Sequence, residues 1–274
     1  MLTVSELKAF LAAHRLRLSK HLGQHHLVDG RVIARLVASI DVAPSDTVVE
    51  IGAGLGALTE PLAARAARVI ALEVDRAICA LMAERMRPFA AVEPRCQDIL
   101  TFRWEEAPGA LAVGAIPYHI TSPLLVWLFE RRRDMKAAYL LLQREVAERL
   151  TARPRIKAYG RLTILCQYGW RVTALAAVPR HAFFPPPRVD STWIRLVPHA
   201  APPVPVADEA RFFAIVRAAF SQRRKTLANC LIQARLASAD EVKALLARAE
   251  VAPGARGEAL SLEQFARLSR HLAG

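Results

Sequence analysis

The stretch Val48-Val49-Glu50-Ile51-Gly52-Ala53-Gly54-Leu55-Gly56 predicts how the first part of the chain folds. Its apolar start predicts a buried strand, and three glycines at alternate positions predict a tight turn into a helix at residues 57–63. A strand, a glycine turn and a helix in this order begin a doubly wound α/β fold, which binds ligands at the carboxyl ends of its strands. The sequence therefore predicts a ligand site beside Gly52 and Gly54.

The spacing of these glycines differs from that of a dinucleotide-binding turn, whose third glycine comes three residues after the second. The next predicted strand, residues 69–72, leads into Glu73, which is placed to accept hydrogen bonds from a ribose. An acid, a glycine turn and a second acid suit a nucleoside cofactor without a pyrophosphate. S-adenosylmethionine is such a cofactor. The alternative is an ordinary tight turn between a strand and a helix.

The remaining predicted strands cover residues 92–96, 110–113, 137–142 and 192–197. Asp98 follows the first of these, where a carboxylate can hold an adenine amino group or cap a turn. Ala115 and Tyr118 follow the second, in a proline-containing turn that suits the stacking of a flat substrate. Ser122 is predicted to cap the helix that comes next.

Composition narrows the class of protein and its partners. The chain has 274 residues, of which 53% are hydrophobic, and no apolar run reaches the roughly 18 residues that span a membrane. We therefore expect a soluble cytoplasmic protein that does not enter a membrane. The net charge of +13 attracts polyanions, and nucleic acid is the first partner to consider. The alternative is that arginine serves here as a general solvated charge.

The four cysteines, Cys79, Cys96, Cys166 and Cys230, lie far apart in the sequence. They form no C-x-x-C pair, so the sequence indicates neither a metal site nor a disulfide framework. We expect all four to be reduced core residues.

A proline-rich stretch, residues 199–207, predicts an extended linker between a first domain of residues 1–198 and a second of residues 208–274. The second domain is predicted to be helical, with helices at residues 210–220, 225–234, 239–250 and 262–272. Arg223, Arg224 and Lys225 form a basic patch at a predicted helix start. Cations there oppose the helix dipole, which favours a phosphate contact over a structural role.

Taken together and in order, these motifs make the chain similar to the small-subunit ribosomal RNA adenine dimethyltransferases. Related large-subunit rRNA methyltransferases that confer macrolide resistance share part of the pattern. The motifs that carry the resemblance are Gly23-Gln-His-His-Leu27, Glu50-Ile-Gly-Ala-Gly-Leu-Gly56, Glu73, Gln97-Asp98, Ile116-Pro-Tyr118, Lys157-Ala-Tyr-Gly-Arg161, Phe183-Phe-Pro-Pro-Pro-Arg-Val189 and Phe220-Ser-Gln-Arg-Arg-Lys-Thr226.

The resemblance implies an S-adenosylmethionine-dependent methyltransferase domain followed by a small helical domain that grips ribosomal RNA of the small subunit. We expect the protein to be a monomer. In such an enzyme the N6 atom of an extruded adenine attacks the cofactor methyl. The resemblance implies that the cofactor is bound by His25, Leu27, Gly52, Gly54, Glu73, Asp98 and Ala115. It implies a catalytic role for Ala115, Tyr118 and Phe183, with Tyr118 and Phe183 enclosing the adenine. RNA binding is implied for Arg223, Arg224 and Lys225.

Two positions depart from the family pattern. Ala115 stands where the family has an asparagine whose carbonyl accepts a proton of the adenine amine, and His26 stands where the family prefers phenylalanine. Loss of one oriented polar group costs on the order of 10²–10³ in rate in comparable sites. The chain is then an enzyme of reduced activity, a catalytically weak RNA binder in ribosome assembly, a relative that methylates a small molecule, or a deliberately altered variant. The basic patch and the proline-rich loop favour RNA.

Overall fold

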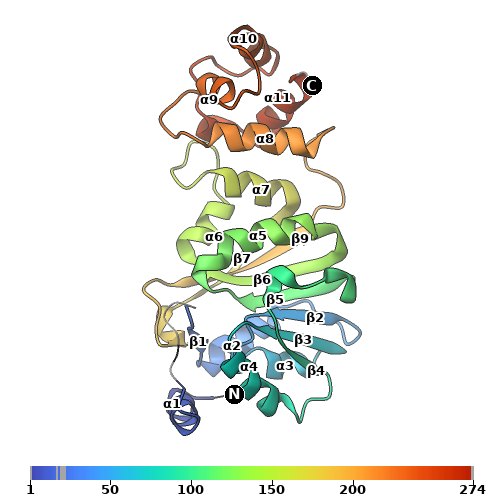
Figure 1. Cartoon of the computed structure of the whole chain (residues 1–274), viewed down its shortest axis with the longest axis vertical. Coiled ribbons are helices and arrows are strands. Elements are labelled where there is room, and N and C mark those ends of the chain that lie inside the picture. The colour runs from blue at the N-terminus through green and yellow to red at the C-terminus, as the bar shows by residue number, and fades with distance from the viewer. Residues whose placement is uncertain (1, 17, 19–22, 273–274) are drawn as a thin grey trace. The chain divides into compact units, whose positions relative to one another are not determined.

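Figure 1 shows a computed structural model of the chain, which describes residues 2–16, 18 and 23–272. The chain forms two compact units. The first consists of Met1–Ala147 and Thr173–Pro198, and the second of Glu148–Val172 and His199–Gly274. Within the described residues, none of the helices has the length and apolar run that a bilayer crossing requires.

The first unit is built on a seven-stranded sheet with the strand order β4-β3-β2-β5-β6-β9-β7. The strands from β4 to β6 run parallel, and β9 pairs antiparallel with β6. Their bounds are β2 (Thr47–Ile51), β3 (Arg68–Glu73), β4 (Val92–Cys96), β5 (Ala110–Ala115), β6 (Met135–Gln143), β7 (Trp170–Val178) and β9 (Ser191–Pro198).

Chain order reverses between β2 and β5, because β3 and β4 follow β2 on one side while β5 and β6 continue on the other. A crevice opens at such a switch point, outside the carboxyl ends of the two strands. In β2, residues 48–51 are all buried, as expected for a parallel strand that is covered on both faces. The predicted doubly wound α/β fold is confirmed.

The helices of the first unit connect these strands. They are α1 (Val4–Ala13), α2 (Gly30–Ala38), α3 (Thr59–Ala63), α4 (Arg76–Met86), α5 (Thr121–Glu130) and the start of α6 (Arg144–Leu150). In α1, which begins with a capping box at Thr3, Leu7 and Leu11 pack against Leu55 of the glycine turn and Ile78 of α4. The N-terminal arm is therefore packed against the outside of the glycine turn.

Two very short strands form a separate two-stranded sheet in the first unit. β1 (His26–Leu27) pairs antiparallel with β8 (Phe183–Phe184), so His26 faces Phe184 and Leu27 faces Phe183. The pairing joins two of the sequence motifs that lie more than 150 residues apart in the chain.

The second unit is helical, with α7 (Arg161–Gly169), α8 (Glu209–Ala219), α9 (Leu227–Gln233), α10 (Ala239–Arg248) and α11 (Leu262–His271). Residues 148–172 belong to it, whereas the linear division of the sequence puts them in the first domain. Buried contacts explain the difference. The Tyr159 hydroxyl donates to the Leu260 carbonyl at 2.7 Å, and Tyr168 stacks on Phe212 at 5.0 Å.

The prediction of four reduced cysteines is wrong for two of them. Cys79 of α4 and Cys96 at the end of β4 form a disulfide, while Cys166 and Cys230 are free and buried as expected. The pair is separated by 17 residues and shows no motif spacing. The crossover from β3 through α4 to the adjacent β4 places the two Cα atoms 5.5 Å apart, within disulfide reach.

Two other local predictions need correction. The N-cap of α5 is Ile120 with no side-chain hydrogen bond, so Ser122 lies inside the first turn and does not cap the helix. The strand β7 was not predicted from the sequence. Its partly exposed, irregular burial pattern explains why, because an edge strand of this kind shows no clean alternation of polar and apolar residues.

Candidate cofactor and substrate site

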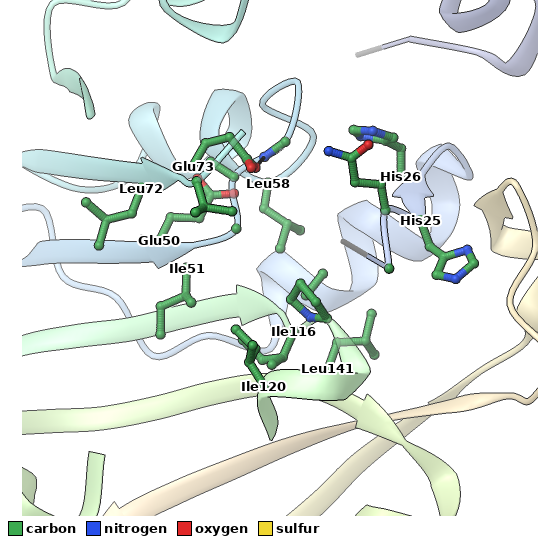
Figure 2. Close-up of a pocket in the computed structure, with 18 of the residues that line it drawn as sticks. His25, His26, Glu50, Ile51, Leu58, Leu72, Glu73, Ile116, Ile120 and Leu141 are labelled. Carbon is green, nitrogen blue, oxygen red and sulfur yellow. Dashed lines mark hydrogen bonds between the residues drawn. The ribbon is translucent and has the colours of Figure 1, made fainter. Parts of the chain in front are cut away.

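A pocket of about 330 Å³ opens in the first unit at the carboxyl ends of β2, β3 and β5. This volume lies in the range of small-molecule sites. Figure 2 shows Glu50 and Glu73 on one side of the pocket, and Ile116, Ile120 and Leu141 on the opposite side. The pocket is lined by all nine residues that the sequence placed at the cofactor and the target base: His25, Leu27, Gly52, Gly54, Glu73, Asp98, Ala115, Tyr118 and Phe183.

The glycine turn follows the carboxyl end of β2 and lines the pocket there. Gly52 and Gly54 have φ angles of +68° and +57°, in the left-handed region that side chains disfavour. A Cβ added at Gly54 would lie 3.0 Å from the His26 ring, whereas one at Gly52 would lie 3.7 Å from the Ala115 carbonyl oxygen. The backbone is therefore available to a ligand because these positions carry no side chain.

Glu73, at the end of β3, is held by the backbone. Its Oε2 accepts from the amide of Gly54 at 2.9 Å, and its Oε1 accepts from the amide of Asp75 at 2.9 Å. Burial raises the pKa of the Glu73 carboxyl, and these hydrogen bonds act in the opposite direction. A carboxylate oxygen can accept more than one bond, so the fixed Glu73 can still receive a pair of ligand hydroxyls.

Glu50 lies deeper, in β2, and is only 2% exposed. The Thr59 hydroxyl donates to its carboxyl at 2.5 Å. Burial raises the pKa of Glu50 to about 8, and the neighbouring Glu73 adds to the rise. Glu50 therefore holds a proton at neutral pH, and a ligand that brings positive charge to this end of the pocket favours the ionised form of Glu50.

Asp98 follows β4 and caps the turn after it, as one of the two alternatives from the sequence predicted. Its Oδ1 caps a short 3₁₀ helix by accepting from the Leu100 amide at 2.9 Å, and the residue also lines the pocket. The side chain is exposed at the pocket edge, beside Gln97.

The two adjacent histidines have different surroundings. The Nδ1–H of His25 donates to the Pro185 carbonyl at 2.7 Å, and its ring lies 5.9 Å from that of Tyr118. His26 is partly buried, and the loss of solvation lowers its pKa to about 4. Its Nε2 has no hydrogen-bond partner among the described residues. His25 therefore lies at the Tyr118 end of the pocket, and His26 is a neutral ring against the glycine turn.

Tyr118 and Phe183 line the pocket from two segments that are distant in the sequence. Tyr118 follows β5, and its hydroxyl is hydrogen-bonded to the Ser191 hydroxyl at 3.2 Å. Burial raises the pKa of Tyr118. Phe183, in β8, is only 6% exposed and belongs to the main core while one part of it lines the pocket. Ala115 ends β5 and contributes a methyl group but no side-chain acceptor.

The predicted RNA-binding residues lie in the second unit. Arg223, Arg224 and Lys225 occupy the exposed turn before α9, whose N-cap is Thr226. They therefore precede the helix and do not form its first turn. Arg17 and Lys20, two cations of the basic segment that precedes Gly23 in the sequence, lie outside the described residues.

Three contacts at the site were not predicted. These are the bond from Thr59 to Glu50, the bond between Tyr118 and Ser191, and the bond from His25 to the Pro185 carbonyl. The first bond lies within one strand–turn–helix unit. The sequence gave one indication of it, a threonine hydroxyl nine residues after the acid in the strand. The other two join residues 73 and 160 positions apart and leave no local signal.

The chain is similar to known proteins over almost its whole length. The profile of the family described as ribosomal RNA adenine dimethylase matches residues 15–274. A protein named ribosomal RNA small subunit methyltransferase A from Geobacillus kaustophilus is 37% identical, with 99% of this chain and 96% of that protein aligned. The protein of the same name from Bacillus mycoides is 38% identical, with 98% and 96% aligned.

Two solved structures share the fold. The crystal structure of the 23S rRNA methyltransferase ErmE has a TM-score of 0.68 and 31% sequence identity, covering 90% of this chain and 98% of that one. A dimethyladenosine transferase from Plasmodium falciparum has a TM-score of 0.73 and 25% identity, covering 89% and 96%.

Proposed function

Because the chain belongs to the ribosomal RNA adenine dimethylase family, we propose that it transfers methyl groups from S-adenosylmethionine to N6 of adenosines in small-subunit ribosomal RNA. The observation that carries the proposal is a single pocket at the switch point of the sheet. It brings the glycine turn, Glu73 and the Tyr118–Phe183 pair together. We further propose that the protein acts as a cytoplasmic monomer.

The residues at the β2 and β3 ends fit a cationic nucleoside. Gly52 and Gly54 leave backbone open to close approach, and Glu73 offers a fixed carboxylate for ribose hydroxyls. Asp98, at the pocket edge, receives the adenine amino group, Leu27 lines the same pocket, and His25 contributes to cofactor binding from the Tyr118 end. S-adenosylmethionine, when bound, supplies an electrophilic methyl group on a positively charged sulfur.

The residues at the β5 end fit the base that is methylated. Tyr118 is anchored through Ser191, so its ring has a defined orientation for stacking. Phe183 lines the same pocket, and enclosure of the base between the two aromatic rings offsets part of the cost of extruding it. These residues bind and orient the adenine, so that its amino nitrogen is aligned with the methyl group.

Ala115 makes this site weaker than the family pattern. An adenine amino group is a poor nucleophile because its lone pair is delocalised, and oriented acceptors for its protons help to direct that lone pair. Ala115 leaves only backbone carbonyls for this purpose. We propose that the chain is active with a reduced rate of methyl transfer.

The test is methyl transfer from labelled S-adenosylmethionine to undermethylated 30S subunits, with the parent chain and Ala115→Asn compared at equal protein. We expect both to label the RNA and Ala115→Asn to raise kcat by about 10²-fold, as an oriented polar group does in comparable sites. Cofactor affinity, measured by calorimetry, is expected to change much less. Glu73→Ala is the control that should abolish calorimetric binding.

Two results would contradict the proposal in different ways. If neither protein labels RNA but a small-molecule extract is methylated, the substrate is wrong. If S-adenosylmethionine does not bind and Glu73→Ala matches the parent, the cofactor is wrong. Binding of 30S subunits without turnover by either protein supports the assembly-factor alternative.

A further inference from the structure

Two loops of the second unit lie side by side, although the sequence separates them by more than sixty residues. One is residues 153–157, Arg-Pro-Arg-Ile-Lys, between α6 and α7. The other is residues 221–225, Ser-Gln-Arg-Arg-Lys, between α8 and α9. Both loops are largely exposed and together carry six cations: Arg153, Arg155, Lys157, Arg223, Arg224 and Lys225.

Arg223 connects the two loops. Its Nη2 donates to the Lys157 carbonyl at 2.8 Å, and its Nε donates to the Glu258 carboxylate at 3.2 Å. Glu258 also holds the first loop, because its backbone carbonyl accepts from the Arg155 amide at 2.8 Å. These bonds fix the relative positions of the two loops, and Glu258 neutralises only one of the six charges.

The first loop has two further local features, one in its backbone and one in its apolar side chain. Arg155 has a φ of +72°, a left-handed conformation that non-glycine residues rarely adopt. Ile156 beside it is 52% exposed, although large apolar side chains are usually buried. Residues held in sparsely populated backbone conformations cluster at active sites and ligand-binding segments, and the exposed Ile156 lies among the cations of this loop.

We propose that the two loops form one RNA-binding surface, in which the 153–157 loop contributes as much as the 221–225 loop. The cations contact phosphates, and Ile156 contacts a sugar or base between them. The inference rests on the proposed function, since that function supplies RNA as the ligand. It extends the site beyond Arg223, Arg224 and Lys225 to a segment for which the sequence pattern alone gave no role.

The test measures binding of the full chain to undermethylated 30S subunits at several KCl concentrations. The variants are Arg153→Gln/Arg155→Gln/Lys157→Gln in the first loop, and Arg224→Gln/Lys225→Gln in the second. The control is Lys243→Gln/Arg248→Gln, which removes two exposed cations from α10 of the same unit. Circular dichroism and thermal melting establish that each variant is folded.

Each lost phosphate contact should lower the slope of log affinity against log salt by about 0.7–0.9. The first-loop variant is therefore expected to lower the slope by about 2–3 and the affinity by roughly 20- to 100-fold at 0.15 M salt. The second-loop variant should lower the slope by about 1.5, while the control keeps the parent slope. Ile156→Ser should weaken binding without a change in slope.

If the first-loop variant keeps the parent slope while the second-loop variant loses it, the inference is wrong and the proposed function stands. Equal losses in the control and the first-loop variant would also overturn it, because net charge alone would then explain binding. If the parent does not bind 30S subunits at any salt concentration, the inference and the proposed function fail together. Because binding is measured without turnover, reduced catalysis from Ala115 does not affect the result.

Discussion

Replacing Glu50 by glutamine is expected to change how the stability of the protein depends on pH. Glu50 is 2% exposed, lies beside Glu73 and accepts a hydrogen bond from Thr59. Burial raises its pKa from 4.5 to about 8. Glutamine has the shape of the protonated carboxyl group and keeps an oxygen that accepts from Thr59, but it does not ionise.

The sign follows from proton binding in the two states. Between pH 4.5 and about 8 the folded protein holds a proton on Glu50 that the unfolded chain has released, so stability falls as pH rises. A shift of about 3.5 units, at about 1.4 kcal/mol per unit, gives a loss of about 5 kcal/mol between pH 4 and pH 9. Glu50→Gln should lack this loss. The two proteins should be similarly stable at pH 5, and the variant more stable at pH 9.

The measurement is urea unfolding of both proteins at intervals from pH 5 to pH 9. Other titrating groups contribute to both curves, so the difference between the curves isolates Glu50 and its coupling to Glu73. Glu84→Gln, which changes an exposed glutamate on α4, is the control and should run parallel to the parent. Parallel curves for Glu50→Gln and the parent would refute the reasoning, because Glu50 would then titrate as an ordinary surface acid.

Two further predictions concern the frame of the pocket. Reduction of the Cys79–Cys96 disulfide with dithiothreitol should lower the free energy of unfolding by about 3 kcal/mol, the value for a loop of about this length. The same reductant should leave a Cys79→Ser/Cys96→Ser variant unchanged in urea unfolding, and an equal effect on both would contradict the assignment. Gly54→Ala should weaken S-adenosylmethionine binding in calorimetry by about tenfold or more, because its Cβ meets His26 at 3.0 Å and its φ is +57°. Gly109→Ala has similar backbone strain but no neighbour within 4 Å, so its cofactor affinity should match that of the parent.

The parts of the fold that depend on local pattern could be predicted from the sequence. The buried run before Gly52 defines β2, and the apolar run before Glu73 defines β3, because burial on both faces leaves a continuous apolar signature. The two acids and the glycine turn are close in sequence to those strands. Their meeting in one pocket follows from the order of parallel strands, which the βαβ pattern predicts.

The parts that depend on pairing between distant segments could not be predicted. Cys79 and Cys96 meet only because α4 crosses back over the sheet, and no spacing rule marks such a pair. Two-residue strands such as β1 and β8 are too short to show a period. Residues 148–172 pack with the helical unit through Tyr159 and Tyr168, whose sequence neighbours give no indication of their distant partners.

The short sheet of β1 and β8 makes one wall common to both ends of the pocket. Leu27 faces Phe183 across this pairing, so a residue assigned to the methyl donor and a residue assigned to the methyl acceptor are neighbours in one ladder. His26 faces Phe184 in the same ladder, which places the histidine that departs from the family pattern next to the Phe183–Val189 motif. A substitution at Leu27 or Phe183 is therefore expected to affect the binding of the methyl donor and of the methyl acceptor together, because the two side chains are paired across one ladder.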